Sequence, residues 1–254
     1  PDTGAGVRLV VGEPYTGTGV GFSSLRIDEP GTDAFVRDVF TELAALTPGP
    51  WLHLGGDEAL GTPPEDFARF VARTSAVIAE LGKTPMAWHE AGAADLAPGT
   101  VGQYWGFVSP TDAAARLARS FADRGGRVVL SPADAVYLDM KPTADAPLGL
   151  TWANGPTSLA CAYDWDPATV VDGLPEDAIL GVEAPLWTET VATLDDIDAL
   201  AFPRIAAAAE IAWSPPTSPD RTWESFRARV GGLGPLWTTL GIRFPAGDEV
   251  PWNV

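Results

Sequence analysis

The chain has 254 residues, and 46% of them are hydrophobic, which is enough for a large folded core. Its 16 basic and 34 acidic residues give a formal net charge of -18, which disfavours nucleic acid and anionic membranes as partners and favours a neutral or cationic small ligand. The single cysteine, Cys161, excludes an intrachain disulfide framework, and no apolar run approaches the roughly 18 to 20 residues that span a bilayer.

Short apolar runs alternate with helical patterns along the chain. This alternation predicts β/α units and a parallel sheet. No internal repeat or linker divides the sequence, so we expect residues 1–254 to belong to one domain. The expected strands lie within residues 51–56, 84–90, 100–106, 127–132 and 179–187.

Helical spacing of apolar residues predicts helices over residues 33–46 and 111–124. A further helix follows the first expected strand. Thr62 and Glu65 have the spacing of a capping box at its start, and Gly82 provides a stop.

The segment of residues 132–178 is long, polar and rich in aromatic side chains. Long excursions of this kind in compact folds are usually functional or disordered, and the aromatic content argues against disorder. Helical patterns return over residues 201–213 and 222–237.

Polar and aromatic side chains gather where the expected strands end. In a (β/α)8 barrel, catalytic groups lie at the carboxyl ends of several strands at once. A doubly wound sheet would usually carry a glycine-rich phosphate turn after its first strand, and the sequence has no such turn. The pattern therefore favours a barrel. The side chains at the strand ends are Asp57 with Glu58, His89 with Glu90, Tyr104 with Trp105, Tyr137 with Asp139, and Trp187 with Glu189.

Ten tryptophans are many for this length, and several lie beside a strand-end carboxylate. A flat aromatic face stacks on the apolar face of a sugar, while carboxylates accept hydrogen bonds from its hydroxyls. The combination predicts carbohydrate chemistry. The tryptophans away from strand ends are expected to fill the core instead, namely Trp51, Trp213, Trp223 and Trp237.

The adjacent carboxylates Asp57 and Glu58 do not suit an ordinary glycosidase, whose two carboxyl groups flank the scissile bond about 5 to 9.5 Å apart. They are better placed to act on one side of a substrate that supplies its own reacting group. Their proximity and burial would raise one pKa and keep one acid protonated. A solvated turn is an alternative explanation. A metal site using His53, Asp57, His89 and Glu90 is another.

The segment HLGGDEA, residues 53–59, resembles the H-x-G-G-D-E signature of glycoside hydrolase family 20, the β-N-acetylhexosaminidases. Further segments are similar to that family in the same order, from about Tyr15 to Trp252. Several ordered motifs are far more specific than one short signature. These segments are AWHE (87–90), QYWG (103–106), SPADAVYLDM (131–140), YDWDP (163–167), GVEAPLWTET (181–190) and FPRIAAAAEIAWSP (202–215).

The resemblance implies a (β/α)8 TIM barrel and removal of terminal, non-reducing β-linked GlcNAc or GalNAc with retention. In this family the substrate's 2-acetamido oxygen is the nucleophile and forms an oxazolinium intermediate. By similarity, Glu58 is the general acid and then the base, and Asp57 holds the acetamido N–H. Tyr137 is expected to hydrogen-bond the acetamido oxygen.

The same resemblance assigns the remaining site residues. Supporting roles are expected of His53, His89 and Glu90, and neither a cofactor nor a catalytic metal is implied. The residues expected to bind the sugar are the aromatic walls Trp88, Trp105 and Trp187 and the hydroxyl-binding acids Asp139 and Glu189.

The chain departs from the family at its start. Family members carry three earlier barrel strands with a sugar-gripping arginine, and none of Arg8, Arg26 or Arg37 stands in a matching context. We therefore expect strands four to eight of the barrel here, with residues 15–26 leading into the third helix. An open barrel exposes two sheet edges, so we expect either that the chain is a fragment of a longer protein or that another chain or a processed piece supplies the missing part as a partner.

Three functions follow from these observations. The first is the retaining β-N-acetylhexosaminidase, acting on β-linked N-acetylhexosamine oligosaccharides or glycoconjugates and secreted from the cell. The second is an inactive sugar-binding remnant of such an enzyme, and the third is a metal-dependent barrel hydrolase using His53 and His89. Nucleic acid and membranes are not expected partners.

Overall fold

The computed structural model describes residues 25–253. Arg8 and most of the segment 15–26 lie outside the described residues. The chain divides into two compact units. Among the described residues, the first holds residues 25–103 and Ala113–Val128, and the second holds Tyr104–Asp112 and residues 129–253.

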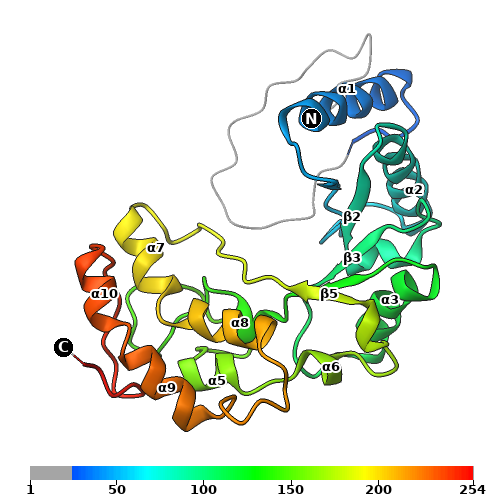
Figure 1. The fold of residues 1–254 in the computed structure, drawn as a ribbon. Helices are drawn as coiled ribbons and strands as arrows, with labels where there is room; N and C mark the ends of the chain where they lie inside the picture. Colours follow the sequence, from blue (N-terminus) through cyan, green and yellow to red (C-terminus); the bar gives the residue numbers. More distant parts are fainter. Residues whose placement is uncertain (1–24, 254) are drawn as a thin grey trace. The chain divides into compact units, whose positions relative to one another are not determined.

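Five short strands alternate with helices in the described part of the chain (Figure 1). In chain order the elements are α1 (Pro30–Leu46), β1 (Trp51–His53), α2 (Pro64–Glu80), β2 (Thr84–Trp88), the 3-10 helix η1 (His89–Ala93), β3 (Val101–Tyr104), α3 (Asp112–Asp123), β4 (Val128–Leu130), α4 (Ala133–Val136), α5 (Leu159–Tyr163), α6 (Pro167–Val170), the 3-10 helix η2 (Glu176–Ala178), β5 (Ile179–Val182), α7 (Leu194–Ala201), α8 (Arg204–Trp213), α9 (Trp223–Gly231) and α10 (Gly234–Thr239).

The strands are hydrogen-bonded in chain order, from β1 to β5. The β1–β2 and β2–β3 pairs are parallel, and their register places Trp51 beside Thr84 and Met86 beside Val101. Parallel neighbours joined by helical crossovers confirm the predicted β/α organisation. Because parallel strands point the same way, the segments that follow β1 and β2 leave the same edge of the sheet.

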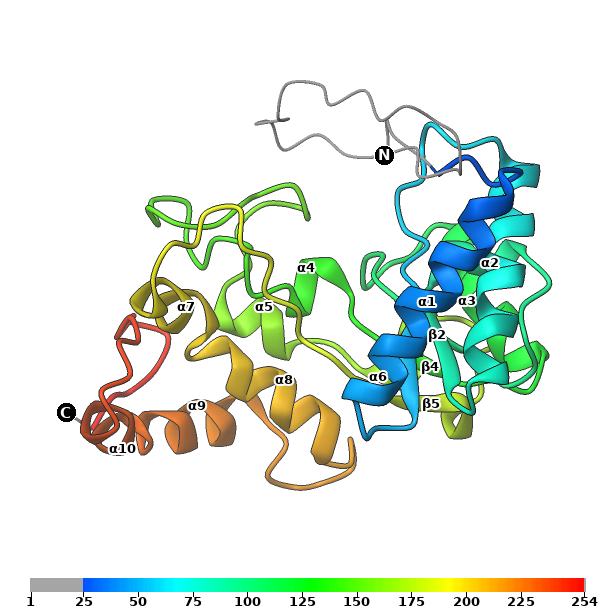
Figure 2. The same cartoon turned by 90° about the horizontal axis from the view of Figure 1, so that it is seen from above.

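In the first unit, helix α2 packs on β2, and α1 runs along α2 and β1 (Figure 2). Val71 and Ile78 are buried on α2, whereas α1 buries Thr32 and Val36 only. A stripe of large apolar side chains on α1 is exposed instead, formed by Phe35, Val39, Leu43 and Leu46. The apolar residues whose helical spacing predicted this helix are therefore only partly covered.

The start of α2 differs from the predicted capping box. Pro63 is the N-cap residue, and no side chain forms a cap hydrogen bond there. With Pro63 in that position, Asp66 rather than Glu65 stands at N3, and proline has no side-chain acceptor, so the box of Thr62 and Glu65 is wrong. The predicted stop is confirmed, since Gly82 follows the helix with φ +76°.

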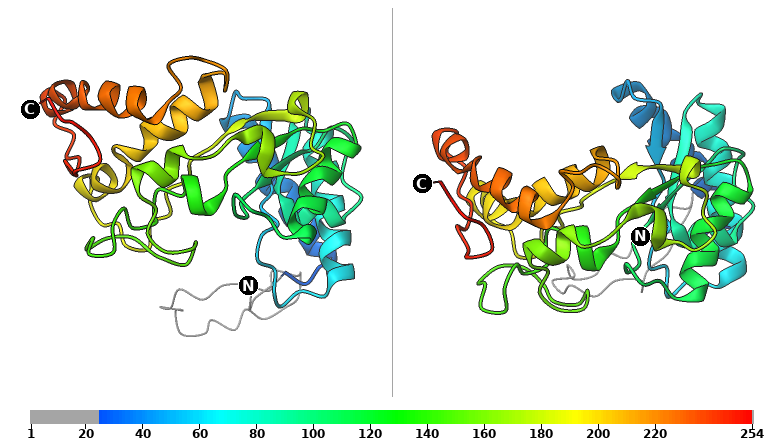
Figure 3. Two further views of the ribbon diagram at one scale, coloured as in Figure 1. Left: turned by 90° about the horizontal axis from the view of Figure 1, so that it is seen from below. Right: turned by 60° about the horizontal axis from the view of Figure 1, so that its bottom comes forward.

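In the second unit, α8 packs against α4, α5, α7 and β5, and the C-terminal helices α9 and α10 follow it (orange to red in Figure 3). Tyr163 of α5 stacks on Phe226 of α9 with ring centroids 4.3 Å apart. Glu210 of α8 accepts a hydrogen bond from the Tyr163 hydroxyl at 3.0 Å and two from Arg229 at 2.6 Å. These contacts tie α5, α8 and α9 together.

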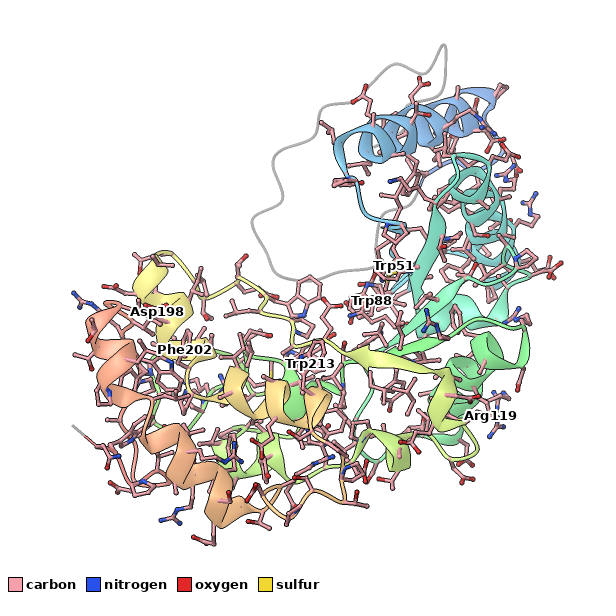
Figure 4. The ribbon with its side chains drawn as sticks, in the orientation of Figure 1. Trp51, Trp88, Arg119, Asp198, Phe202 and Trp213 are labelled. Atoms are coloured by element: carbon pink, nitrogen blue, oxygen red, sulfur yellow. The ribbon has the colours of Figure 1, made fainter. Side chains whose placement is uncertain are left out.

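Only some of the tryptophans that were predicted to fill the core are buried. Trp237 is buried, in contact with Phe202 and Trp252. Trp51 on β1 is 44% exposed, and Trp213 at the end of α8 is 88% exposed. Both side chains are labelled in Figure 4. For Trp51 and Trp213 the prediction is wrong among the described residues.

Candidate active site

The two adjacent carboxylates lie on a turn, residues 54–58, that follows β1 in the first unit. Backbone hydrogen bonds hold this turn to the end of β2, from Leu54 N to Met86 O at 2.9 Å and from Trp88 N to Gly55 O at 3.0 Å. Gly55 and Gly56 have φ of +82° and +98°, a region that glycine enters without steric cost. The GG of the signature is therefore needed for the shape of this turn.

Glu58 itself has φ of +47°. Few residues other than glycine adopt this region, and such backbone strain is concentrated at functional sites. Partial burial raises the pKa of the Glu58 carboxyl, and the negative charge of Asp57 raises it further. Both effects favour the protonated acid, which is the form that can donate a proton to a leaving group.

His53 at the end of β1 supports the same turn. Its Nδ1 accepts a hydrogen bond from the Gly55 N–H at 3.0 Å, which requires an unprotonated Nδ1. Burial lowers the pKa of His53, while the charge of Asp57 and a side-chain hydrogen bond between His53 and Gln103 oppose that shift. Its ring meets Trp88 edge-on, with centroids 5.1 Å apart (Trp88 is labelled in Figure 4). A neutral His53 thus links the turn to the aromatic side chain at the end of β2.

His89 and Glu90 follow Trp88 in η1. His89 is buried, and burial lowers its pKa to about 4, so the ring is neutral near pH 7. Its Nδ1 lies 3.4 Å from Oε2 of Glu90. The neutral ring makes this a polar contact and not an ion pair.

An aromatic cluster forms in the second unit around Tyr137, which is buried after α4. Its ring lies 5.8 Å from that of Trp152 and 6.2 Å from that of Trp187, and the ring of Trp105 lies 6.0 Å from that of Trp152. Met140 is packed in the same cluster. Trp152 and Trp187 are more than one-third exposed, so the cluster presents aromatic surface to solvent.

Asp139 lies two residues beyond Tyr137, and its carboxylate is buried. Leu138 N donates to Pro185 O at 2.8 Å, which joins this segment to the one that carries Trp187 and Glu189. Burial raises the pKa of Asp139 to about 6, the backbone amides of Asp139 and Trp187 lower it, Glu189 raises it and Arg204 lowers it.

The predicted residues thus fall into two sets. The first unit brings together the turn carboxylates, both histidines, Trp88 and Glu90, and the second unit brings together the aromatic cluster and its acids. Arg26 and Arg37, considered as sugar-gripping arginines, form ion pairs with Glu29 at 4.0 Å and Glu80 at 2.7 Å. The roles of the site residues stay predictions.

Sequence reasoning missed three residues at these places. Gln103 is buried in β3 and forms a side-chain hydrogen bond with His53. It belongs to the motif QYWG, but the sequence alone assigned it no role. Trp152 joins the aromatic cluster from the long polar segment, where only its aromatic character marked it. Arg204, inside the motif FPRIAAAAEIAWSP, acts on Asp139 from 65 positions away, a distance across which no local pattern gives a signal.

Within residues 25–253 no three His, Cys, Asp or Glu side chains are grouped as metal ligands would be. Over the same residues, none of the helices combines the length and apolar character needed to cross a membrane.

Comparisons with known proteins agree with the resemblance. A family model described as glycosyl hydrolase family 20, catalytic domain, matches residues 13–216. A β-N-acetylhexosaminidase of Cellulomonas fimi is 44% identical over 244 residues, which are 95% of this chain and 48% of that protein. The chain therefore spans about half the length of this curated relative.

Solved structures show the same fold. A glycoside hydrolase family 20 β-N-acetylglucosaminidase superposes with a TM-score of 0.90 at 62% identity, over 94% of this chain and 51% of that one. The N-acetyl-β-hexosaminidase of Streptomyces plicatus, solved in complex with Thio-NAglucal, superposes with a TM-score of 0.89 at 47% identity, over 94% of this chain and 47% of that one. The predicted fold class, a family 20 barrel represented by five strands, is confirmed, and this chain belongs to glycoside hydrolase family 20.

Proposed function

We propose that the protein is a retaining exo-β-N-acetylhexosaminidase that removes terminal, non-reducing β-linked GlcNAc or GalNAc by substrate-assisted catalysis. The observation that carries the proposal is the turn of residues 54–58. It places Asp57 and Glu58 next to each other at the end of β1, with Glu58 in a strained conformation and with its pKa raised. Family membership and the names of the relatives support the same chemistry.

In the proposed first step, the acetamido oxygen of the bound sugar attacks C1, and the bond from C1 to the leaving oxygen breaks. Glu58 gives its proton to that oxygen, which is why a raised pKa is useful. Asp57 accepts a hydrogen bond from the acetamido N–H and stabilises the positive charge of the oxazolinium intermediate. Tyr137 donates a hydrogen bond to the acetamido oxygen.

In the second step, water attacks C1 from the side that the leaving group vacated, and the oxazolinium ring opens. Glu58, now ionised, removes a proton from this water and returns to its acid form. Two displacements at C1 give net retention. One nucleophile comes from the substrate, so both protein carboxylates act from the same turn.

Substrate binding is assigned to the aromatic and acidic side chains. We propose that Trp88, Trp105 and Trp187 pack against the apolar parts of the sugar. Asp139 and Glu189 accept hydrogen bonds from its outer hydroxyls. Secretion of the protein stays a prediction.

The test is the substitution Glu58→Gln, assayed on a chromogenic β-GlcNAc substrate. It is made in the 254-residue chain and in a form extended upstream by the three expected β/α units. Loss of proton transfer in both steps should lower kcat by about 10²- to 10⁴-fold. The matched control is Glu65→Gln on the exposed first turn of α2, which should keep the parent rate.

Two outcomes would contradict the proposal. Full activity of Glu58→Gln would remove Glu58 as the acid. An extended parent protein that binds GlcNAc but releases none from the substrate would favour the sugar-binding remnant.

A further inference from the structure

Arg204, the first residue of α8, is a charged side chain that is only 2% exposed. One terminal nitrogen, Nη2, donates to the carbonyls of Leu138 at 2.6 Å and Leu200 at 2.7 Å, and Nη1 donates to the carbonyl of Thr157 at 3.3 Å. Burial of an ion is costly unless hydrogen bonds compensate for lost hydration. A buried arginine therefore calls for an explanation other than core filling, and the three carbonyls that accept its hydrogen bonds indicate one.

Two of these carbonyls bracket a single loop, residues 138–157, at whose start Asp139 lies. The two limbs of the loop are joined by backbone hydrogen bonds, from Leu150 N to Asp139 O, from Lys141 N to Leu150 O and from Thr157 N to Lys141 O, each 2.8 Å long. Arg204 bonds the residue before Asp139 and the residue at the end of the returning limb. Its planar guanidinium therefore fixes the base of this loop.

The Asp139 carboxylate is buried, and its acceptor oxygens are not used by the described part of the protein. It is 1% exposed, and neither of its oxygens has a protein partner that meets hydrogen-bond geometry, although the amides of Asp139 and Trp187 lie near enough to lower its pKa. The charged groups that act on it are Glu189, which raises its pKa, and Arg204, which lowers it. Burial lowers the pKa of Arg204 to about 10, so the guanidinium is charged near pH 7.

We propose that Arg204 is a positioning residue for sugar binding: it fixes the main chain at both ends of the loop of residues 138–157 and supplies the positive charge that keeps the Asp139 carboxylate ready to accept hydroxyl hydrogen bonds. The inference rests on the proposed function, because Asp139 is there the acid that binds the outer hydroxyls. Arg204 contacts no substrate atom in this scheme. It acts through Asp139.

The competing explanation is that Arg204 only stabilises the contact between α7 and α8. If that were its only role, replacing Arg204 would lower the stability of the protein without changing the pH dependence of sugar binding. The two explanations therefore differ in KM and in the acid limb of kcat/KM. Arg229 offers a matched control, because it ties α8 to α9 through Glu210, and its other hydrogen bonds go to Ser225 and Asp220, outside residues 138–157.

The experiment compares Arg204→Lys, Arg204→Met and Arg229→Lys in the extended protein on chromogenic β-GlcNAc. Arg204→Lys keeps the positive charge but loses the planar guanidinium that bonds several carbonyls at once. KM should therefore rise about tenfold or more, while the acid limb of the kcat/KM profile stays near that of the parent. Arg204→Met also loses the charge, so the acid limb should move to higher pH. Arg229→Lys should leave KM and the acid limb unchanged.

A double-mutant cycle with Asp139→Asn shows whether the effect passes through Asp139. Once Asp139 is replaced, Arg204→Lys should change KM by less than about threefold, because coupled neighbours are not additive. Additive effects, or an Arg204→Lys variant that behaves like Arg229→Lys, would overturn the inference. If Arg204→Met does not fold, Arg204→Lys and the double-mutant cycle still distinguish the positioning role from a purely structural one.

Failure of the inference can be separated from failure of the proposed function. If the extended parent hydrolyses the substrate and the Arg204 variants match it, only the inference is wrong. If the parent releases no sugar, the proposed function is wrong. NMR titration of the Asp139 carboxyl then tests whether Arg204 acts on Asp139. A higher Asp139 pKa in Arg204→Met than in the parent would then support the positioning role, and an unchanged pKa would overturn it.

Discussion

The turn of residues 54–58 and the loop of residues 138–157 raise a carboxyl pKa in different ways. Glu58 is exposed, and its pKa is raised by partial desolvation and by Asp57 beside it in the chain. Asp139 is buried, and burial is the main cause of its raised pKa, which the backbone amides of Asp139 and Trp187 and then Arg204 oppose. The turn depends on neighbouring residues, whereas the loop depends on residues brought together by the fold.

The backbone shows the same contrast. The turn is shaped by Gly55, Gly56 and a Glu58 of positive φ, within four residues. The loop is held by hydrogen bonds between its limbs and by an arginine from α8. A substitution near the turn should therefore affect the proton-transfer chemistry, and a substitution near the loop should affect sugar binding.

Among the substitutions that compare the turn with the loop, Asp57→Asn should have the largest effect on turnover. Loss of the negative charge that holds the acetamido group should lower kcat by about 10²- to 10³-fold. It also removes the repulsion that raises the Glu58 pKa, so the basic limb of the kcat profile should move to lower pH. An unchanged basic limb, measured with a slow but detectable variant, would show that Asp57 does not tune Glu58.

A smaller effect is expected when either of two matched glycines in the second unit is replaced by alanine. Gly149 and Gly155 have φ of +98° and +97°. A Cβ at Gly149 would lie 2.8 Å from the carbonyl oxygen of Asp139 and 2.9 Å from Lys141 N, whereas a Cβ at Gly155 would meet nothing within 4 Å.

Both alanine variants should lose roughly 1 to 2 kcal/mol of stability from the strained φ. Only Gly149→Ala should also raise KM, by several fold, because the backbone at Asp139 must move. Equal KM values for the two variants, at matched folded fractions by circular dichroism, would show that sugar binding does not depend on this close approach.

A further prediction concerns stability and not turnover, and tests the burial of Asp139 by the pH dependence of stability. Its pKa is raised from 3.8 to about 6 on folding, so its contribution to stability is present below pH 4 and is lost as pH rises through 6. Asp139→Asn should therefore be more stable than the parent at pH 7, by up to about 3 kcal/mol.

This gain should vanish toward pH 4, and the variant should bind GlcNAc more weakly despite its higher Tm. Thermal unfolding between pH 4 and pH 8 measures the effect, with Asp123→Asn on the exposed end of α3 as control. Equal Tm differences at both ends of the range would mean that Asp139 is not a buried acid.

The sequence predicts features that depend on neighbouring residues and fails where tertiary contacts decide. Adjacency of Asp57 and Glu58 and the stop at Gly82 were visible, since each depends on local backbone chemistry. The capping box at Thr62 was wrong because the next proline shifted the helix start. The exposure of Trp213 and the contact of Arg204 with the Asp139 loop depend on which elements pack together, which spacing along one chain does not encode.

The central claim is that the substrate supplies the nucleophile. The most direct measurement compares kcat/KM of the extended parent on a chromogenic β-GlcNAc and on the matched glucoside, in which a hydroxyl replaces the acetamido group. The account predicts a loss of about 10³-fold or more, corresponding to about 4 kcal/mol of transition-state stabilisation. Comparable rates on the two substrates would contradict it, because Asp57 and Glu58 would then act without an acetamido oxygen.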